Sequence, residues 1–161
     1  MVEMSVDESA SLDDIDKKLL LILQQDAKTP YTKISEEIGI SEATVHLRIK
    51  RLLKIGVIRG FRAIVDPEKI GLTVKAFLGL KATPGRDKSI EEELKKIPCI
   101  YEIHWTTGRY NLLLKIITRD VKDLVAVMNK IGGIPGVNEI EVLSVLKTVK
   151  EDTRMNIPAE D

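Results

Sequence analysis

Basic side chains are concentrated in one stretch of this 161-residue chain. The whole chain has 25 basic and 25 acidic residues, and its formal charge is zero. Between Lys28 and Arg62, however, eight basic residues stand against only three glutamates. A local excess of positive charge attracts phosphate groups, so this stretch is a candidate nucleic-acid contact. Its basic residues are Lys28, Lys33, Arg48, Lys50, Arg51, Lys54, Arg59 and Arg62.

The residue types that catalysis and metal binding need are few and scattered. His46 and His104 lie far apart in the sequence, and Cys99 is the only cysteine. A single cysteine excludes an intrachain disulfide and a cysteine-built zinc site, and it suits a reducing compartment. No apolar run approaches the roughly 20 residues of a membrane span. We therefore expect a cytoplasmic protein that is not an enzyme, has no metal or cofactor and does not enter a membrane.

Apolar periodicity predicts three helices around the basic stretch. The first follows Asp13 and Asp14, whose carboxylates suit a helix start, and it ends near Asp26. The second is short, with Ile34 and Ile38 on its buried side. A third helix would then carry most of the basic side chains.

The connection between the second and third helices is very short. Gly39 suits a left-handed helix end, and Ser41 suits the N-cap of the next helix, with Glu42 in its first turn. Two helices joined by so tight a turn predict a helix-turn-helix.

A helical wheel divides the third helix into two faces. Val45, Ile49 and Leu52 form a buried stripe, and after Glu42 no acidic residue follows until Asp66. The opposite face carries Ala43, Leu47, Lys50 and Lys54, with His46 and Arg51 at its flanks. A helix that only had to be soluble would interleave acids, so we expect one that reads a DNA groove. With the segment behind it, the expected DNA contacts are Thr44, His46, Leu47, Arg48, Lys50, Arg51, Lys54, Arg59 and Arg62.

Simpler explanations exist for individual members of this set. Leu47 could contact a thymine methyl group, but a single exposed apolar residue is ordinary. His46 is equally well explained as an exposed helix residue without a role. A basic helix face taken alone would be a solvated surface, and it is the tight turn before it that favours DNA binding.

The chain changes character twice behind the third helix. Residues Val57 to Val65 alternate and are rich in β-formers, which predicts a strand or wing that would bring Arg59 and Arg62 beside DNA. Pro67 and Gly71 then predict a linker. We expect a disordered tail over residues 1–11, a helix-turn-helix domain with wing over 12–65, a linker over 66–72 and a second domain over 73–161.

The second domain has the pattern βαββαβ, which is typical of the ferredoxin-like α+β fold, an antiparallel sheet with both helices on one face. Apolar residues of the third strand, and Leu143 with Val145 in the last, fall on both faces of the sheet. The uncovered face therefore predicts pairing with a second copy across a two-fold axis. Strands are expected at Val74–Ala82, Ile100–Thr106, Leu112–Thr118 and Val137–Val149, and helices at Ser89–Lys96 and Val121–Ile131.

These features, in this order, resemble the Lrp/AsnC or feast/famine family of prokaryotic regulators. The resemblance runs from Leu12 to about Ile157 and implies a transcription regulator that binds double-stranded DNA. Known members dimerise through the C-terminal domain, associate further into octamers and often bind an amino acid between subunits. The motifs that carry it are the capped turn, Arg48-Ile49-Lys50-Arg51-Leu52, Gly56-Val57-Ile58, Thr107-Gly108-Arg109-Tyr110-Asn111 and Ile134-Pro135-Gly136-Val137.

The resemblance also implies an effector site, and the chain departs from the family there. Where members commonly have an acidic residue after the glycine and Asp after the aromatic residue, this chain has Arg109 and Asn111. A guanidinium attracts a carboxylate and cannot hold an ammonium group. The alternative is a tight hairpin with an incidental arginine. The implied effector residues are Thr106, Thr107, Gly108, Arg109, Tyr110, Asn111 and Gly136.

Two other classes of function stay open at this point. A ferredoxin-like domain can host catalysis, although the scatter of His46, His104 and Cys99 disfavours it. The chain could also be a metabolite-binding module whose helix-turn-helix contacts only proteins. Salt-dependent binding to DNA distinguishes these classes.

Overall fold

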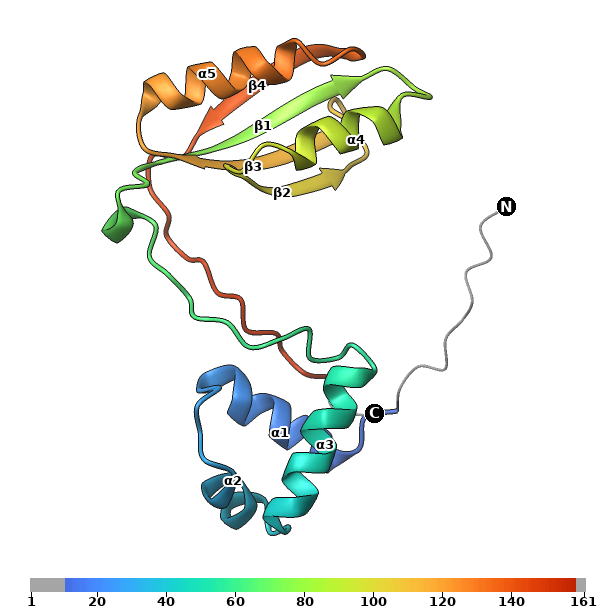
Figure 1. Ribbon diagram of the computed structural model, residues 1–161, viewed down its shortest axis with the longest axis vertical. Coiled ribbons are helices and arrows are strands. Elements are labelled where there is room, and N and C mark those ends of the chain that lie inside the picture. The colour runs from blue at the N-terminus through green and yellow to red at the C-terminus, as the bar shows by residue number, and fades with distance from the viewer. Residues whose placement is uncertain (1–10, 159–161) are drawn as a thin grey trace. The chain divides into compact units, whose positions relative to one another are not determined.

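The chain folds as two compact units, and the computed structural model describes residues 11–158 (Figure 1). The first unit runs to Ala63 and also contains the segment from Glu151 onward, and the second is Ile64–Lys150. Sequence reasoning had placed the last residues in the second domain, but the Gln24 side chain bonds both backbone groups of Met155. The tail expected over residues 1–11 lies outside the described residues except for Ser11. Within the described part, no helix is long and apolar enough to cross a membrane.

The described part of the first unit contains three helices, α1 (Asp14–Gln25), α2 (Tyr31–Ile38) and α3 (Glu42–Lys54), as predicted. A capping box starts α1: the Asp13 carboxylate accepts a hydrogen bond from the Asp16 N–H at 2.8 Å, and the Asp13 N–H donates back to Asp16. The three helices share one small apolar core, which fixes α3 against α1 and α2. That core consists of Leu19, Leu23, Ile34, Val45 and Ile49.

The predicted strand or wing over residues 57–65 is wrong. After α3 the Ile58 N–H donates to the Leu52 carbonyl at 3.1 Å, and the segment then continues without regular structure. Phe61 and Ile64 are exposed along it. A strand needs a neighbour to take its hydrogen bonds, and none of the described segments pairs with this one. Alternating β-formers are therefore not sufficient to make a strand here.

The second unit has the predicted βαββαβ order and a four-stranded antiparallel sheet in the order β2-β3-β1-β4, so the ferredoxin-like α+β prediction is confirmed. Strand β4 ends at Ser144 and not at Val149. Ser144 pairs with Ala76 and β1 begins at Val74, so residues 147–149 have no strand-pairing partner on β1, although the Val145 N–H still donates to the Lys75 carbonyl at 2.9 Å. A short 3-10 helix, Glu68–Ile70, interrupts the linker. The remaining elements are β1 (Val74–Ala82), α4 (Asp87–Lys95), β2 (Ile100–Trp105), β3 (Leu112–Thr118), α5 (Val121–Gly132) and β4 (Val137–Ser144).

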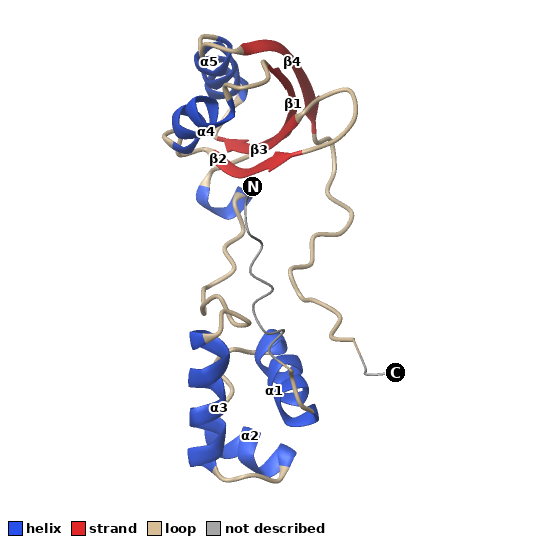
Figure 2. Cartoon of the chain, turned by 90° about the vertical axis from the view of Figure 1, so that its right-hand side faces the viewer, coloured by secondary structure: helices blue, strands red, loops and turns tan. Residues whose placement is uncertain are grey.

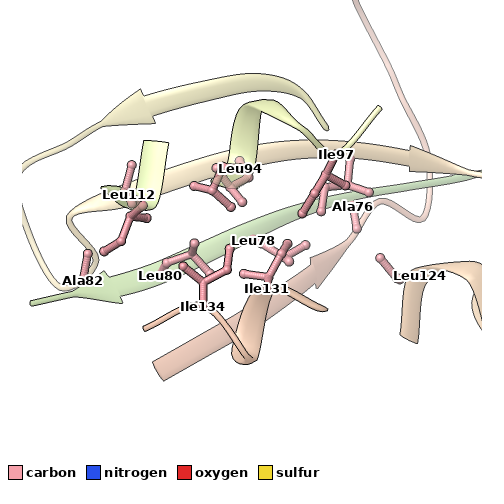
Figure 3. Close-up of a cluster of buried hydrophobic side chains, with 13 residues drawn as sticks. Ala76, Leu78, Leu80, Ala82, Leu94, Ile97, Leu112, Leu124, Ile131 and Ile134 are labelled. Atoms are coloured by element: carbon pink, nitrogen blue, oxygen red, sulfur yellow. The ribbon is translucent and has the colours of Figure 1, made fainter. Parts of the chain in front are cut away.

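Both helices of the second unit cover the same face of its sheet (Figure 2). Leu78 and Leu80 of β1 point into the core between them, with Ile131 of α5 and Leu94 of α4 (Figure 3). Neither helix covers the other face (Figure 2), where Phe77 of β1 lies opposite Leu143 of β4. Leu143 is 54% exposed. The sheet thus presents an apolar patch on the side away from its helices.

Candidate nucleic-acid interface and ligand-binding loop

The turn between α2 and α3 is fixed at both ends. Gly39 ends α2 in the left-handed region, with φ of 81°. Ser41 caps α3, and its hydroxyl oxygen accepts a hydrogen bond from the Thr44 N–H at 3.1 Å. The hydroxyl groups of Ser41 and Thr44 also share a hydrogen bond of 2.8 Å. The start of α3 is therefore rigid, and Thr44 lies at it.

The two faces of α3 are those that the sequence predicts. Val45, Ile49 and Leu52 are buried, whereas Leu47 is 65% exposed. Lys50 and Lys54 are exposed as well and form no hydrogen bond or ion pair with the described part of the chain. The solvent face of α3 thus combines one apolar side chain with two lysines whose charges are unopposed within residues 11–158.

His46 is in contact with the neighbouring helix. Its ring lies 5.9 Å, between centroids, from the ring of Tyr31 at the start of α2, and the two planes are tilted by 54°. Both residues are exposed. His46 is therefore held at the flank of α3, next to α2, where the wheel places it.

Arg48 and Arg51 differ from the lysines because they are paired with carboxylates of α1. Arg48 Nη1 lies 2.6 Å from Asp13 Oδ2 and 2.9 Å from Asp16 Oδ1, and Arg51 Nη1 lies 3.0 Å from Asp16 Oδ2. The Asp16 backbone N–H, and then the Arg48 guanidinium, hold the pKa of Asp13 below its ordinary value. The hydrogen bond to Asp13 raises the pKa of Arg48.

Sequence reasoning missed the acidic members of this cluster. Asp13 was assigned only to the helix start, and Asp16, which is just 1% exposed, was not singled out. The available signal in the sequence was a second acid three residues after an N-cap acid, the spacing of a capping box. Arg59 and Arg62, by contrast, lie exposed in the irregular segment after α3, and neither has a partner among the described residues.

The loop between β2 and β3 is held by bonds across it. The Thr106 N–H donates to the Asn111 carbonyl at 3.0 Å, and the Thr106 hydroxyl donates to the Tyr110 carbonyl at 2.8 Å. Gly108 has a φ of 108°, which a side chain would strain. Thr107 and Gly108 are exposed at the tip of the loop.

Asn111 extends the sheet with its side chain. Its Oδ1 accepts from the Ala82 N–H at 2.7 Å and its Nδ2 donates to the Ala82 carbonyl at 3.0 Å, as a neighbouring strand would. Ala82 also pairs with Val137, which directly follows Gly136. The structure thus brings the predicted effector residues Asn111 and Gly136 to the two sides of the end of β1.

Tyr110 lies on the open face of the sheet, against Gly79. A Cβ atom at Gly79 would come within 2.7 Å of the Tyr110 ring, so the ring requires a glycine there. The Arg109 guanidinium lies 5.0 Å from the centre of the same ring, and the Tyr110 hydroxyl donates to Glu139 at 3.2 Å. Desolvation, with Glu141 acting in the same direction, raises the pKa of Tyr110 to about 12.

Glu139 balances the positive charge of this loop, and sequence reasoning did not find it. Its carboxylate is bonded by Lys81 at 2.6 Å and by Arg109 at 3.2 Å. These hydrogen bonds, that of Lys81 foremost, lower the pKa of Glu139. Arg109 thus belongs to a charge cluster on β1, β4 and the loop.

Comparison with known proteins leads to the same family for both units. Residues 12–53 match the AsnC-type helix-turn-helix domain, and residues 75–155 match the Lrp/AsnC ligand binding domain. The HTH-type transcriptional regulator FL11 of Pyrococcus horikoshii is 42% identical over 146 residues, which cover 91% of this chain and 97% of that protein.

Solved structures agree with the sequence matches. The structure of E. coli AsnC is similar with a TM-score of 0.84 and 30% identity, covering 89% of this chain and 97% of that one. A transcriptional regulator from Neisseria meningitidis, solved as a complex with L-methionine, gives a TM-score of 0.85 at 25% identity, with coverage of 91% and 97%. With both domain models matched and close relatives aligned over nearly their whole length, this chain belongs to the Lrp/AsnC family of transcriptional regulators.

Proposed function

We propose that this chain regulates transcription by reading double-stranded DNA with α3. The observation that carries the proposal is the solvent face of that helix, where exposed Leu47 lies among lysines without an acidic partner in the described chain. A basic face of this kind contacts phosphates, and an apolar side chain can contact a thymine methyl group. The proposed contacts are Thr44, His46, Leu47, Arg48, Lys50, Arg51, Lys54, Arg59 and Arg62.

Selection from a pool of random duplexes tests this proposal. The full-length chain should enrich a pseudo-palindromic sequence and bind it more tightly than a shuffled duplex of the same composition, by at least ~10³-fold at physiological salt. Equal binding to both duplexes at all salt concentrations would refute sequence-specific recognition.

The open face of the second unit is the proposed dimer interface. Phe77, Leu113 and Leu143 bring apolar side chains to the face that α4 and α5 do not cover. A second copy related by a two-fold axis would bury the same residues on both chains, and dimers could assemble further into an octamer. The proposal predicts that Leu143→Asp produces monomers in sedimentation velocity. The matched change Val121→Asp, on exposed Val121 of α5, should leave the assembly intact, and equal assembly of both variants would contradict this interface.

The loop between β2 and β3 is the proposed site of a small effector, an amino acid or a related metabolite. Support comes from the charge cluster of Lys81, Arg109 and Glu139, and from the similar Neisseria protein that was solved with L-methionine. The proposed residues are Thr106, Thr107, Gly108, Arg109, Tyr110, Asn111 and Gly136.

Titration calorimetry with the common amino acids tests this site. Arg109→Gln should weaken binding, whereas Arg119→Gln, which breaks an exposed pair with Asp123 on α5, should not. Coupling between effector and DNA must be reciprocal. The selected duplex should therefore change the affinity for the effector by the same factor by which the effector changes the affinity for the duplex. Equal binding by both variants would place the effector elsewhere.

A further inference from the structure

The carboxylate of Asp16 connects two helices of the DNA-binding unit. The side chain is 1% exposed, and each of its oxygens accepts a hydrogen bond from a different arginine of α3. A buried carboxylate is stable only when it is paired and hydrogen-bonded, so this arrangement is specific and not a chance surface contact. Arg48 and Arg51 are three residues apart and so lie on one side of α3.

The two arginines are held differently. Arg48 is 24% exposed, and its Nη1 is shared between Asp13 and Asp16. Arg51 is 46% exposed and gives only Nη1 to Asp16. Both arginines use only Nη1 of their five-donor guanidiniums toward these carboxylates, so they differ in exposure and in the number of carboxylates each one faces. Arg48 is thus the less exposed arginine and is paired with two carboxylates, whereas Arg51 is paired with one and is more accessible to another acceptor.

The cluster is continuous with the face that we propose to meet DNA. A surface hollow of about 370 Å³ is lined by Thr44 and Leu47 of that face, together with Asp16 and both arginines. An acceptor that entered beside Leu47 would therefore meet Arg51 in a fixed orientation. A guanidinium held by one carboxylate loses less conformational freedom when it binds a phosphate than a free one would.

We propose that Asp16 is a positioning residue for DNA recognition, an inference that rests on the proposed function. Its buried carboxylate fixes Arg48 as an anchor between α1 and α3 and presents Arg51 to a phosphate of the bound duplex. Arg48 itself contacts no phosphate. This inference reduces the number of basic residues of α3 that contact phosphates. Arg51 contacts a phosphate together with Lys50 and Lys54, whereas Arg48 holds α3 against α1.

The test compares two substitutions that remove the same charge. Asp16→Asn and Asp14→Asn each delete one carboxylate from the first turns of α1, and Asp14 is exposed without a partner in residues 11–158. Both variants should bind a shuffled duplex at least as well as the wild type. Only Asp16→Asn should lose affinity for the duplex selected by the wild type, by about tenfold, the size of one charge-assisted hydrogen bond.

Salt dependence separates the two arginines. Removal of one phosphate contact flattens the slope of log K against log salt by about 0.9. Arg51→Gln should show this change, whereas Arg48→Gln should keep the wild-type slope. The double variant Asp16→Asn/Arg51→Gln should bind the selected duplex no worse than Arg51→Gln alone, because both changes remove one interaction.

Three outcomes would overturn the inference. One is that Asp16→Asn and Asp14→Asn change the affinities for the selected and the shuffled duplex by the same factors. Another is that the loss of affinity in Asp16→Asn/Arg51→Gln equals the sum of the losses in the two single variants. If Asp16→Asn does not fold, equal flattening by Arg48→Gln and Arg51→Gln still refutes it. A wild-type chain that enriches no duplex would instead refute the proposed function itself, so the two failures are distinguishable.

Discussion

The substitution Asn111→Asp should destabilise the second unit far more than its small size suggests. Asn111 both accepts from and donates to the backbone of Ala82, at 2.7 and 3.0 Å. Aspartate keeps the acceptor but replaces the donor with a second oxygen, which would then face the Ala82 carbonyl oxygen. Loss of a bond that leaves a partly buried acceptor unsatisfied costs about 1–3 kcal/mol. We expect the free energy of unfolding to fall by about 2 kcal/mol at pH 7.

A matched control is available in the same unit. Asn138 also donates through Nδ2, but to the Thr83 hydroxyl at 3.0 Å, in an exposed position. A hydroxyl can turn and donate to a carboxylate, so Asn138→Asp should change stability by only about 0.5 kcal/mol or less. The measurement is urea denaturation of both variants at one fixed protein concentration, because self-association would also shift stability.

The pH dependence of this effect has a definite sign. The new carboxylate is disfavoured when ionised, so its pKa in the folded state should lie above that in the unfolded chain. When protonated it can again donate to Ala82, and the deficit of Asn111→Asp should therefore shrink as the pH falls toward about 4. Equal stability of the Asn111→Asp and Asn138→Asp variants at pH 7 would refute the reasoning.

Three further predictions concern the open sheet face and the start of α1. Gly79→Ala, whose Cβ would come within 2.7 Å of the Tyr110 ring, should lower the free energy of unfolding by about 1–3 kcal/mol. Gly132→Ala, whose Cβ would meet only a side chain at 3.6 Å, should not lower it. Equal urea midpoints of the two variants would contradict the close packing of Tyr110 on Gly79. Spectroscopic titration should find one phenol that ionises near pH 12, and Tyr110→Phe should remove this transition. The stability that the raised pKa of Tyr110 contributes is present below the unfolded pKa of about 10 and is lost as the pH rises through 12. The pKa of Asp13 is lowered by the Asp16 N–H first and by the Arg48 guanidinium second, so the advantage of the wild type over Asp13→Asn should be present above the ordinary value of 3.8 and vanish as the pH falls through the lower folded-state pKa. An advantage independent of pH would contradict these two interactions.

Local pattern was sufficient to predict most of the elements. Helices α1 to α3 follow from apolar spacing with caps at Asp13, Gly39 and Ser41, and these signals act within a few residues. The limits of β1 and β3 were predicted to the residue, because each is a short, mainly apolar run with few polar residues. Elements whose cause lies inside the segment are the ones that sequence reasoning can place.

The errors occur where a distant partner decides the structure. Residues 57–65 alternate like a strand but find none to pair with, and residues 147–149, predicted as part of the last strand, have no strand-pairing partner on β1. The final segment is grouped with the first unit, where Gln24 bonds Met155 from 131 residues away. Pairing across the fold leaves no trace in local periodicity.

The same distinction applies to the candidate sites. The wheel placed Leu47 and Lys50 on the solvent face of α3, and the structure has both exposed there. It could not show that Asp16 neutralises Arg48 and Arg51, because that contact joins two helices. Charge counted along the chain overstated the basic face, since Arg48 and Arg51 already have carboxylate partners whereas Lys50 and Lys54 do not.

The salt dependence of binding to the selected duplex tests the central proposal, that the solvent face of α3 reads DNA, most directly. Lys50→Ala/Lys54→Ala should flatten the slope of log K against log salt by about 1.8, because each lysine neutralises one phosphate in the wild-type complex. Lys122→Ala, on exposed Lys122 of α5 in the second unit, controls for a general change of charge and should leave the slope unchanged. A wild-type slope and affinity in the double variant would show that another surface of the protein binds DNA.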